Sequence, residues 1–184
     1  MRLWLVRHAR PDLPPGICYG AWNVPAEAIA SQHTAQALAE ILPPKVALEV
    51  SPRQRCTLLA QHLSEARPDL VPRLNPDLAE LNFGQWEGQA WADIPHEEIN
   101  AWTQNFAHYR PGDGESAEAL MVRVARAWDA ACTRNVDTVW LSHAGVIRAA
   151  HLLHQGVRHV TRADQWPVEG PGFGEWRTMD LPQG

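Results

Sequence analysis

Short apolar runs alternate with longer stretches of helical periodicity along the chain. The apolar runs have the length and composition of buried strands, and they lie at 2–6, 46–50, 70–74 and 137–141, with a last strand expected within 172–181. Apolar residues at helical spacing predict helices over 26–42, 53–66, 95–107 and 144–155, the last followed by Gly156. A further long helix should begin after Ser116, whose hydroxyl is a favourable N-cap.

Strands that alternate with helices form βαβ units, and such units build a mainly parallel sheet covered by helices on both faces. The 184 residues contain no repeat and no long linker, and this length suits one hydrophobic core. We therefore predict a single α/β domain over 1–184. In such a domain the ligand site lies beyond the carboxyl ends of the strands.

Three of the predicted strands are each followed by a cation or an imidazole. These groups are Arg7-His8, the segment Ser51-Pro-Arg-Gln-Arg55 and the pair Ser142-His143. If the strands are parallel neighbours, all three groups meet at one edge of the sheet. Arginine offers a planar fork of donors that matches phosphoryl oxygens, and histidine can act as a nucleophile or proton carrier. The pattern predicts a phosphate site.

Charge and cysteine content narrow the possible partners. The formal net charge is -5 and the pI about 6.0, which gives no general attraction to nucleic acid or to an anionic membrane. Cys18, Cys56 and Cys132 are an odd number without a Cys-x-x-Cys pair, so we expect reduced thiols in a cytoplasmic protein. No apolar stretch approaches the roughly 20 residues of a membrane span.

Five segments resemble, in order, the motifs of the histidine phosphatase superfamily, also called the phosphoglycerate-mutase-like family. They are Leu5-Val-Arg-His8, Ser51-Pro-Arg-Gln-Arg-Cys56, Leu78-Ala-Glu-Leu-Asn-Phe-Gly-Gln-Trp-Glu-Gly88, Gly114-Glu-Ser116 and Ser142-His-Ala-Gly-Val-Ile-Arg148. The resemblance implies a three-layer α/β/α sandwich with a mainly parallel central sheet, which agrees with the pattern of strands and helices.

The same resemblance implies a role for each matching residue. His8 would be the phosphoryl acceptor, Glu80 the proton donor, and Arg7, Arg55 and His143 the ligands of the phosphoryl oxygens. His8 must be neutral to attack, and we expect the arginines to disfavour its protonated form while a backbone carbonyl holds its other ring N–H. A protonated His143 should add positive charge at the oxygens. The scheme requires no metal or other cofactor.

Some residues near these motifs have a second interpretation. Glu87 lies seven residues after Glu80 and could be structural or could compete for the role of the acid. Arg10, Arg53 and Arg148 could shape the rim of the site, although the solvated surface is the favoured position for Arg53 and Arg148.

Histidines and tryptophans outside the motifs also leave alternatives. His151 and His154 share a helix face, but no well-placed carboxylate or cysteine completes a set of metal ligands. Four tryptophans in or near the predicted loops could stack on an aromatic substrate or pack beneath those loops: Trp22, Trp86, Trp91 and Trp102.

The chain departs from the superfamily pattern just after the first motif. Ala9 replaces the usual glycine, and Arg10 stands where Glu or Gln is common. Many members place an asparagine a few residues later, whereas here the first asparagine is Asn23. One polar contact to phosphate is therefore missing or supplied from elsewhere. We expect these changes to affect rate and substrate choice more than reaction type.

We expect a small phosphomonoester as the substrate, and the chain length and loop sequences indicate which one. Mutases of the superfamily are generally longer, with added segments over the site, so 184 residues favour hydrolysis. The length, the loop at 15–20 and the Gly-Glu-Ser segment most resemble the α-ribazole phosphatases, which implies removal of the 5′-phosphate of α-ribazole phosphate in cobalamin synthesis. The alternative is a broad-specificity or sugar-phosphate phosphatase, ahead of a phosphoglycerate mutase or an inactive phospho-ligand binding module.

Overall fold

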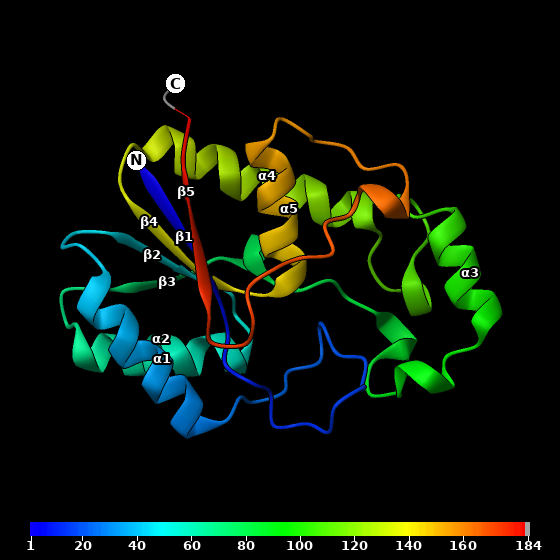
Figure 1. Cartoon of the computed structure of the whole chain (residues 1–184), viewed down its shortest axis with the longest axis horizontal. Helices are drawn as coiled ribbons and strands as arrows, with labels where there is room; N and C mark the ends of the chain where they lie inside the picture. Colours follow the sequence, from blue (N-terminus) through cyan, green and yellow to red (C-terminus); the bar gives the residue numbers. More distant parts are fainter. Residues whose placement is uncertain (183–184) are drawn as a thin grey trace.

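The computed structural model describes residues 1–182 and arranges them around a five-stranded sheet (Figure 1). The strands are β1 (Arg2–Arg7), β2 (Ala47–Val50), β3 (Pro72–Leu74), β4 (Thr138–Ser142) and β5 (Trp176–Asp180), in the spatial order β3-β2-β4-β1-β5. Neighbours pair in parallel, except that β5 runs antiparallel to β1. Each strand lies inside its predicted segment or extends it by one residue.

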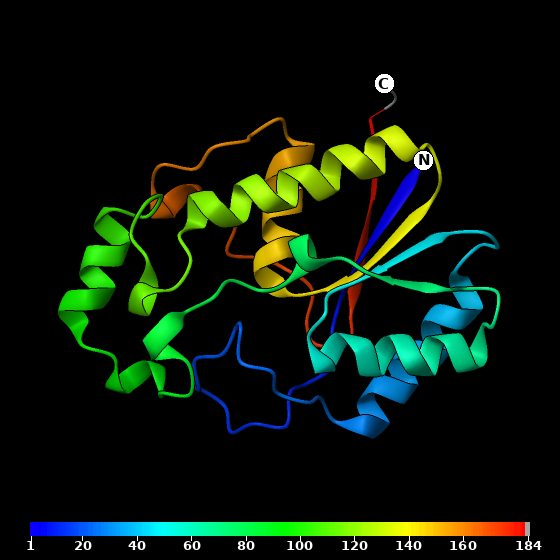
Figure 2. The same ribbon diagram turned by 180° about the vertical axis from the view of Figure 1, so that it is seen from behind.

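Helices cover both faces of the sheet, as Figures 1 and 2 show. The first pair, α1 (Ala28–Ile41) and α2 (Gln54–Ala66), lies on one face, and α4 (Ala117–Arg134) and α5 (Ala144–His154) lie on the other. The remaining helix, α3 (His96–Gln104), stands to one side of the sheet. The architecture is the expected three-layer α/β/α sandwich with a mainly parallel sheet.

Apolar side chains of β1 and β4 point to both faces of the sheet, so helices must pack against each face. Leu3, Leu5 and Trp140 belong to the core under α4 and α5, whereas Trp4 and Val6 belong to the core under α1 and α2. Successive residues of a strand point to opposite faces. A strand that is apolar at every position is therefore stable only between two layers of helices.

Local signals set several helix ends. The Ser116 hydroxyl accepts a hydrogen bond from the Ala119 N–H at 3.2 Å and caps α4, as predicted. Gly156 follows α5 with a φ of 81°, a conformation that glycine adopts without strain. Helix α3 is shorter than its pattern because the backbone leaves the helical region at Asn105. Among residues 1–182, no helix is both long and apolar enough to cross a membrane.

Candidate active site

The carboxyl ends of β1, β2 and β4 meet at one edge of the sheet, as predicted. The ladders continue past the strand ends: the His8 N–H donates to the Ser142 carbonyl at 3.1 Å, and the Ser51 N–H donates to the Leu141 carbonyl at 2.9 Å. The rings of His8 and His143 are brought to a centroid distance of 5.1 Å. Two residues far apart in the sequence thus share one site.

His8 has the protonation state that a nucleophile requires. Its ring is almost fully buried, and Nδ1 lies 2.7 Å from the carbonyl oxygen of Ala9. A carbonyl can only accept, so Nδ1 carries the proton and Nε2 keeps a free lone pair. Burial lowers the pKa of His8 to about 3, and the positive charges of Arg55 and Arg7 act in the same direction. The arginines therefore act as expected, but burial is the larger cause.

His143 is fully buried, and both of its ring nitrogens are engaged. Nε of Arg55 donates to Nδ1 at 3.2 Å, and Nε2 lies 2.7 Å from the hydroxyl oxygen of Ser51. Burial, followed by the charge of Arg55, holds the pKa of His143 well below its usual value. The expectation of a protonated His143 is therefore wrong, because a nitrogen that accepts a bond from a guanidinium carries no proton of its own.

Arg55 is completely buried and holds the loop that follows β1. Its terminal nitrogens donate to the carbonyls of Trp22 at 2.9 Å and Gly20 at 2.7 Å. Together with the bond to His143, these contacts use three of the five guanidinium N–H donors and leave two for a phosphoryl group. Position 20 requires a glycine, because a Cβ there would collide with the carbonyl oxygen of Leu81.

Arg7 enters the site from the end of β1. One terminal nitrogen donates to the carbonyl of Pro171 at 3.2 Å, and the guanidinium carbon lies 3.9 Å from the ring centroid of Phe173. Its Nε is buried, with no acceptor within residues 1–182. A buried charged donor without a partner is suited to an anionic ligand.

Two aromatic residues of the site were missed by sequence reasoning. The ring centroids of Tyr19 and Phe173 lie 6.4 Å and 5.6 Å from that of His8, and Tyr19 also lies 5.1 Å from the guanidinium carbon of Arg55. The signal for Tyr19 was its place in the loop at 15–20. For Phe173 the signal was the glycine-rich segment around it, in which the Gly174 N–H donates to the His8 carbonyl at 3.1 Å.

Glu87 is held as a structural carboxylate. It accepts hydrogen bonds of 2.7 to 3.0 Å from the backbone N–H groups of Gly20, Ala21, Trp22 and Phe83. Four donors occupy the lone-pair sites of a carboxylate. Glu87 thus ties the loop after β1 to the segment at 83, and little of its hydrogen-bonding capacity remains for a substrate.

Glu80 is placed differently. It accepts from the N–H groups of Leu81 and Gly145 at 3.0 and 3.1 Å, and its carboxylate faces two cavities. Gly145 lies in the first turn of α5, two residues after His143, and a Cβ at this position would collide with Oε1 of Glu80. The glycine therefore lets the carboxylate lie against the helix N-terminus beside the histidines. This geometry favours Glu80 over Glu87 as the proton donor.

Glu80 lines both cavities. The first, called the aromatic cavity below, has a volume of about 180 Å³ and is lined by Glu80, Arg148 and the four rings of Phe83, Trp102, Phe106 and Trp166, among others. The second, called the polar cavity, has a volume of about 500 Å³, and its lining includes Arg53, Arg110 and Arg123. A leaving group beside Glu80 can therefore meet an apolar or a cationic surface.

The polar residues expected around the site differ in position. Arg10 is exposed. Arg53 and Arg148 are half-buried and line the polar and the aromatic cavity, so their expected position on the solvated surface is corrected. Asn23 accepts a hydrogen bond from the N–H of Gln54 at 2.8 Å, at the start of α2. Its side-chain oxygen therefore caps the N-terminus of α2.

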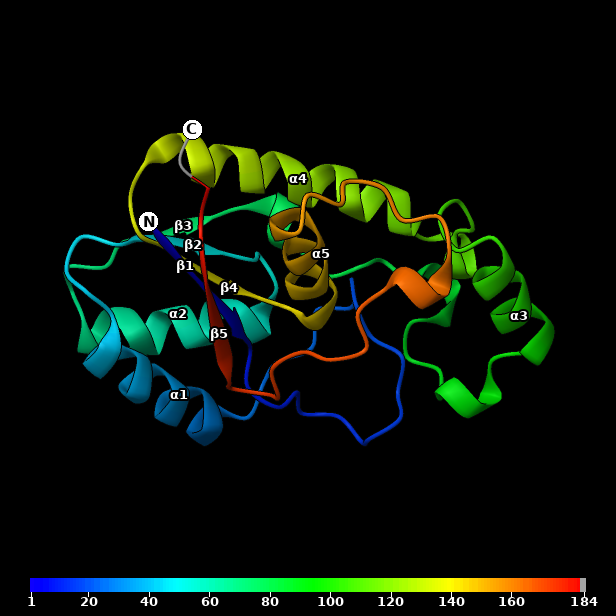
Figure 3. The same ribbon diagram turned by 45° about the horizontal axis from the view of Figure 1, so that its top comes forward.

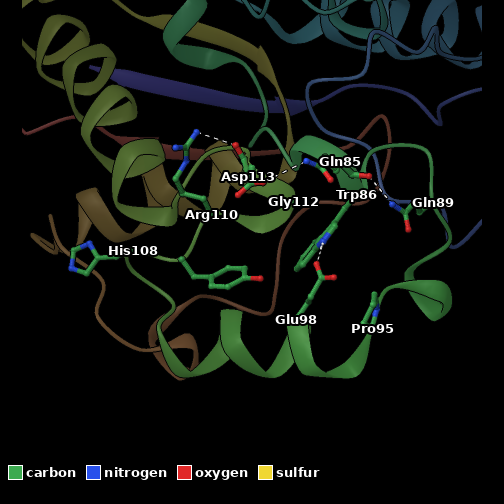
Figure 4. A pocket seen from close by; sticks show the side chains of 10 residues that line it. Gln85, Trp86, Gln89, Pro95, Glu98, His108, Arg110, Gly112 and Asp113 are labelled. Atoms are coloured by element: carbon green, nitrogen blue, oxygen red, sulfur yellow. Dashed lines mark hydrogen bonds between the residues drawn. The ribbon is translucent and has the colours of Figure 1, made fainter.

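A larger cavity of about 530 Å³ lies beside α3, and none of its lining residues is a predicted site residue (Figure 4). Trp86 forms part of its wall and donates from Nε1 to Glu98 at 2.6 Å. Trp86, Trp91 and Trp102 contact one another, and Trp91 and Trp102 also contact Phe83. Packing is thus the role of Trp86 and Trp91, whereas Trp102 also lines the aromatic cavity.

One thiol borders the site, because Sγ of Cys56 lies 3.6 Å from Nε2 of His143. Burial raises the pKa of Cys18 and of Cys56 to about 12, so both thiols are protonated and unreactive at neutral pH. In the described part of the chain, no three side chains of His, Cys, Asp or Glu are grouped as metal ligands. His151 is hydrogen-bonded to Gln155 at 3.1 Å.

The chain belongs to the histidine phosphatase superfamily (branch 1), whose sequence profile matches residues 3–168. The matched span contains all five motifs and the strand-end histidines. The family match and the relatives named below support a phosphatase enzyme.

Named relatives are similar to this chain over different spans. An adenosylcobalamin/alpha-ribazole phosphatase of Salmonella typhimurium is 31% identical over 68% of this chain, and the match spans only 64% of that relative. Its Salmonella typhi counterpart is 28% identical over 100% of this chain and 92% of its own length.

Two solved structures are also similar. A Thermus thermophilus protein, TTHB049, is 28% identical, with a TM-score of 0.73 over 100% of this chain and 95% of its own. A mycobacterial glucosyl-3-phosphoglycerate phosphatase is 22% identical, with a TM-score of 0.79 over 96% and 88% of the two chains. At that identity the likeness concerns the fold alone.

Proposed function

We propose that this protein hydrolyses a phosphomonoester through a phosphohistidine on His8, and that its substrate is α-ribazole 5′-phosphate. The observation that carries the mechanism is the hydrogen bond from Nδ1 of His8 to the Ala9 carbonyl. It leaves Nε2 as a neutral nucleophile beside the uncommitted N–H donors of Arg7 and Arg55.

In the first step, Nε2 of His8 attacks the phosphorus, and the bond from phosphorus to the leaving oxygen breaks. Arg7 and the two remaining donors of Arg55 bind the equatorial oxygens, where charge accumulates. Neutral His143 acts through its contact with Arg55, which it holds in position. The carboxyl group of Glu80 gives its proton to the leaving alkoxide.

In the second step, the carboxylate of Glu80 takes a proton from water as the water oxygen attacks the phosphorus. The bond between phosphorus and Nε2 breaks, inorganic phosphate leaves, and His8 returns to its neutral state. Glu80 ends the cycle protonated, so the proton count balances. Glu80 lines both cavities and accepts a hydrogen bond from Gly145, two residues after His143, and this position suits it to serve the two steps in turn.

Two observations support α-ribazole 5′-phosphate as the substrate. The Salmonella relatives that carry this activity in their names are 31% and 28% identical to the chain. The aromatic cavity beside Glu80 offers an apolar surface to the leaving group, which in this substrate is a nucleoside with a dimethylbenzimidazole base. Removal of its phosphate would be a step of cobalamin synthesis.

A sugar-phosphate phosphatase is the second candidate, and the polar cavity favours it. Arg53 and Arg110 line that cavity on the other side of Glu80, where they could bind hydroxyl or carboxylate groups of a leaving sugar or glycerate. The two candidates share the chemistry at His8 and differ in the cavity that the leaving group fills.

The test is phosphate release by the wild type and by His8→Ala, with EDTA present. The panel contains α-ribazole 5′-phosphate, phosphoglycerates, sugar phosphates and p-nitrophenyl phosphate. We expect the wild type alone to release phosphate, fastest from α-ribazole 5′-phosphate, and to form an acid-labile, alkali-stable phosphoenzyme. Fastest release from a sugar phosphate would select the second candidate. A His8→Ala protein that kept the wild-type rate would refute the mechanism.

A further inference from the structure

We propose that the aromatic cavity binds a planar aromatic ring carried by the leaving alcohol, and that Trp102 and Arg148 are walls on which this ring packs. This inference rests on the proposed function, because it assigns the leaving group of the same hydrolysis. It adds a specificity site to the phosphate site.

The aromatic cavity adjoins the phosphate site. Its wall includes the carboxylate of Glu80 and the first turn of α5 at Gly145, which follows His143 by two residues. Burial lowers the pKa of Arg148, on the same helix, and the charges of Glu80 and Arg7 also act on it, the first raising and the second lowering the pKa. A ring in this cavity can therefore belong to the molecule whose phosphate lies against His8.

The walls of the cavity come from segments that are distant in the sequence. The C-terminal end of α3, the N-terminal parts of α4 and α5, and Trp166 contribute to it, and Figure 3 shows the turn at 163–165, just before Trp166, beside the N-terminal half of α4. Phe106 and Leu120 add apolar surface that is almost fully buried. A ribose or glycerate would leave these apolar walls uncovered.

The volume of about 180 Å³ suits one ring system. Apolar protein cavities of about 150 Å³ bind benzene. A flat ring could stack on the surrounding aromatic side chains and on the guanidinium of Arg148.

Nε1 of Trp102 and Nε of Arg148 are buried and do not open onto the cavity, and neither has an acceptor within the residues that the structure describes. Recognition of the ring therefore rests on stacking and apolar contact with the cavity walls.

The test is a ratio of two kcat/KM values, for α-ribazole 5′-phosphate and for ribose 5-phosphate, which lacks the ring. A general loss of activity cancels in this ratio. We expect the wild type to prefer the first substrate by at least about tenfold. Ala117→Leu, which fills the cavity, should abolish the preference, and Trp102→Phe, which makes the aromatic wall smaller, should lower it about three- to tenfold.

The matched control is Trp91→Phe. Trp91 stacks on Trp102 at a centroid distance of 6.4 Å but does not line the cavity, so its replacement should leave the ratio unchanged. Equal ratios in the wild type, Ala117→Leu and Trp102→Phe would overturn the inference. If Ala117→Leu does not fold, as judged by circular dichroism, Trp102→Phe alone decides.

Binding of the unphosphorylated nucleoside distinguishes a failure of the proposed function from a failure of this inference. Calorimetry with α-ribazole and the His8→Ala protein measures the cavity without catalysis. Binding that is lost when Ala117→Leu is added supports the inference even if no substrate is hydrolysed. Absence of binding, with hydrolysis of ring-free phosphates intact, overturns the inference and leaves the phosphatase mechanism standing.

Discussion

Arg55 and His143 share a buried hydrogen bond in which Nε of the guanidinium donates to Nδ1 of the imidazole at 3.2 Å. Because Nδ1 accepts, a neutral His143 carries its proton on Nε2, which lies 2.7 Å from the hydroxyl oxygen of Ser51. The tautomer is therefore set by residues at the end of β2 and the start of α2. His143 positions the phosphate-binding arginine and is itself positioned by Ser51.

Ser51→Ala should lower kcat more than the replacement of another equally buried serine does. It leaves Nε2 of His143 without its oxygen partner, so we expect kcat to fall about tenfold and the free energy of unfolding to fall by about 1–2 kcal/mol. Ser142→Ala is the matched control, because the Ser142 hydroxyl is equally buried but donates to the Leu78 carbonyl. Kinetics and thermal melts of both variants separate the effects; an equal loss of kcat in the two would contradict the positioning role.

Arg55→Lys should be severe although it keeps the charge. An ammonium group cannot contact His143, Gly20 and Trp22 as the planar fork does. We expect at least about a hundredfold loss of kcat/KM and a loss of about 2–4 kcal/mol in the free energy of unfolding. For comparison, Arg158→Lys alters a half-exposed pair with Asp129 and should cost less than about 1 kcal/mol. Near-normal activity of Arg55→Lys would show that the fork is dispensable.

The two carboxylates should respond differently to amide substitution. Glu80→Gln should lower kcat by about 100- to 10,000-fold with little change in stability. The loss should be smaller for p-nitrophenyl phosphate, whose leaving group needs no proton. Glu87→Gln should instead lower the melting temperature, because an amide accepts fewer of the four N–H groups that the carboxylate holds. The reverse pattern would transfer the acid role to Glu87.

Stability should decline as the solution becomes acidic, and His8 should account for part of the decline. The unfolded state binds a proton near pH 6.5, whereas the folded state resists protonation down to about pH 3. Between these values the unfolded state holds more protons, so the free energy of unfolding falls as pH falls, by at most about 1.4 kcal/mol per pH unit for this histidine.

The measurement is urea unfolding from pH 6.5 to 5, above the range of most carboxyl groups. His8→Ala should be less sensitive to acid than the wild type, by up to about 2 kcal/mol across this interval. Replacement of the exposed His33 by alanine serves as the control and should leave the wild-type slope. Identical slopes in the wild type and His8→Ala would contradict the low pKa of His8.

The sheet edge was predictable because it depends on short-range patterns. Apolar runs gave β1, β2 and β4 nearly to the residue, and parallel pairing then brought His8, Arg55 and His143 together. The motif order supplied the proposed roles of these residues and of Glu80, and the geometry supports them. Strand ends carry this information because the chain direction fixes which edge they reach.

The hydrogen-bond pattern around His143 was not predictable, because Ser51 and Arg55 lie 92 and 88 positions away in the sequence. Its charge state followed from that pattern, so the expectation of a cation failed. Tyr19 and Phe173 come from loops without periodicity, and their approach to His8 depends on how those loops fold over the sheet. The separate roles of Glu80 and Glu87 likewise required the positions of backbone N–H groups.

The loop segment that carries α3 has a small core of its own, formed by Cys18, Trp86 and Ile94 and separate from the two cores that cover the sheet. Phe83 and Trp102 pack against this small core and also against the core under α4 and α5, so the substrate-selecting region has contacts of its own in addition to those that it shares with the sheet. Its own contacts allow these loops to be redesigned while the phosphate site is conserved. A graft of residues 83–110 from a relative with another substrate would be expected to change which alcohol is released and to retain phosphoryl transfer at His8.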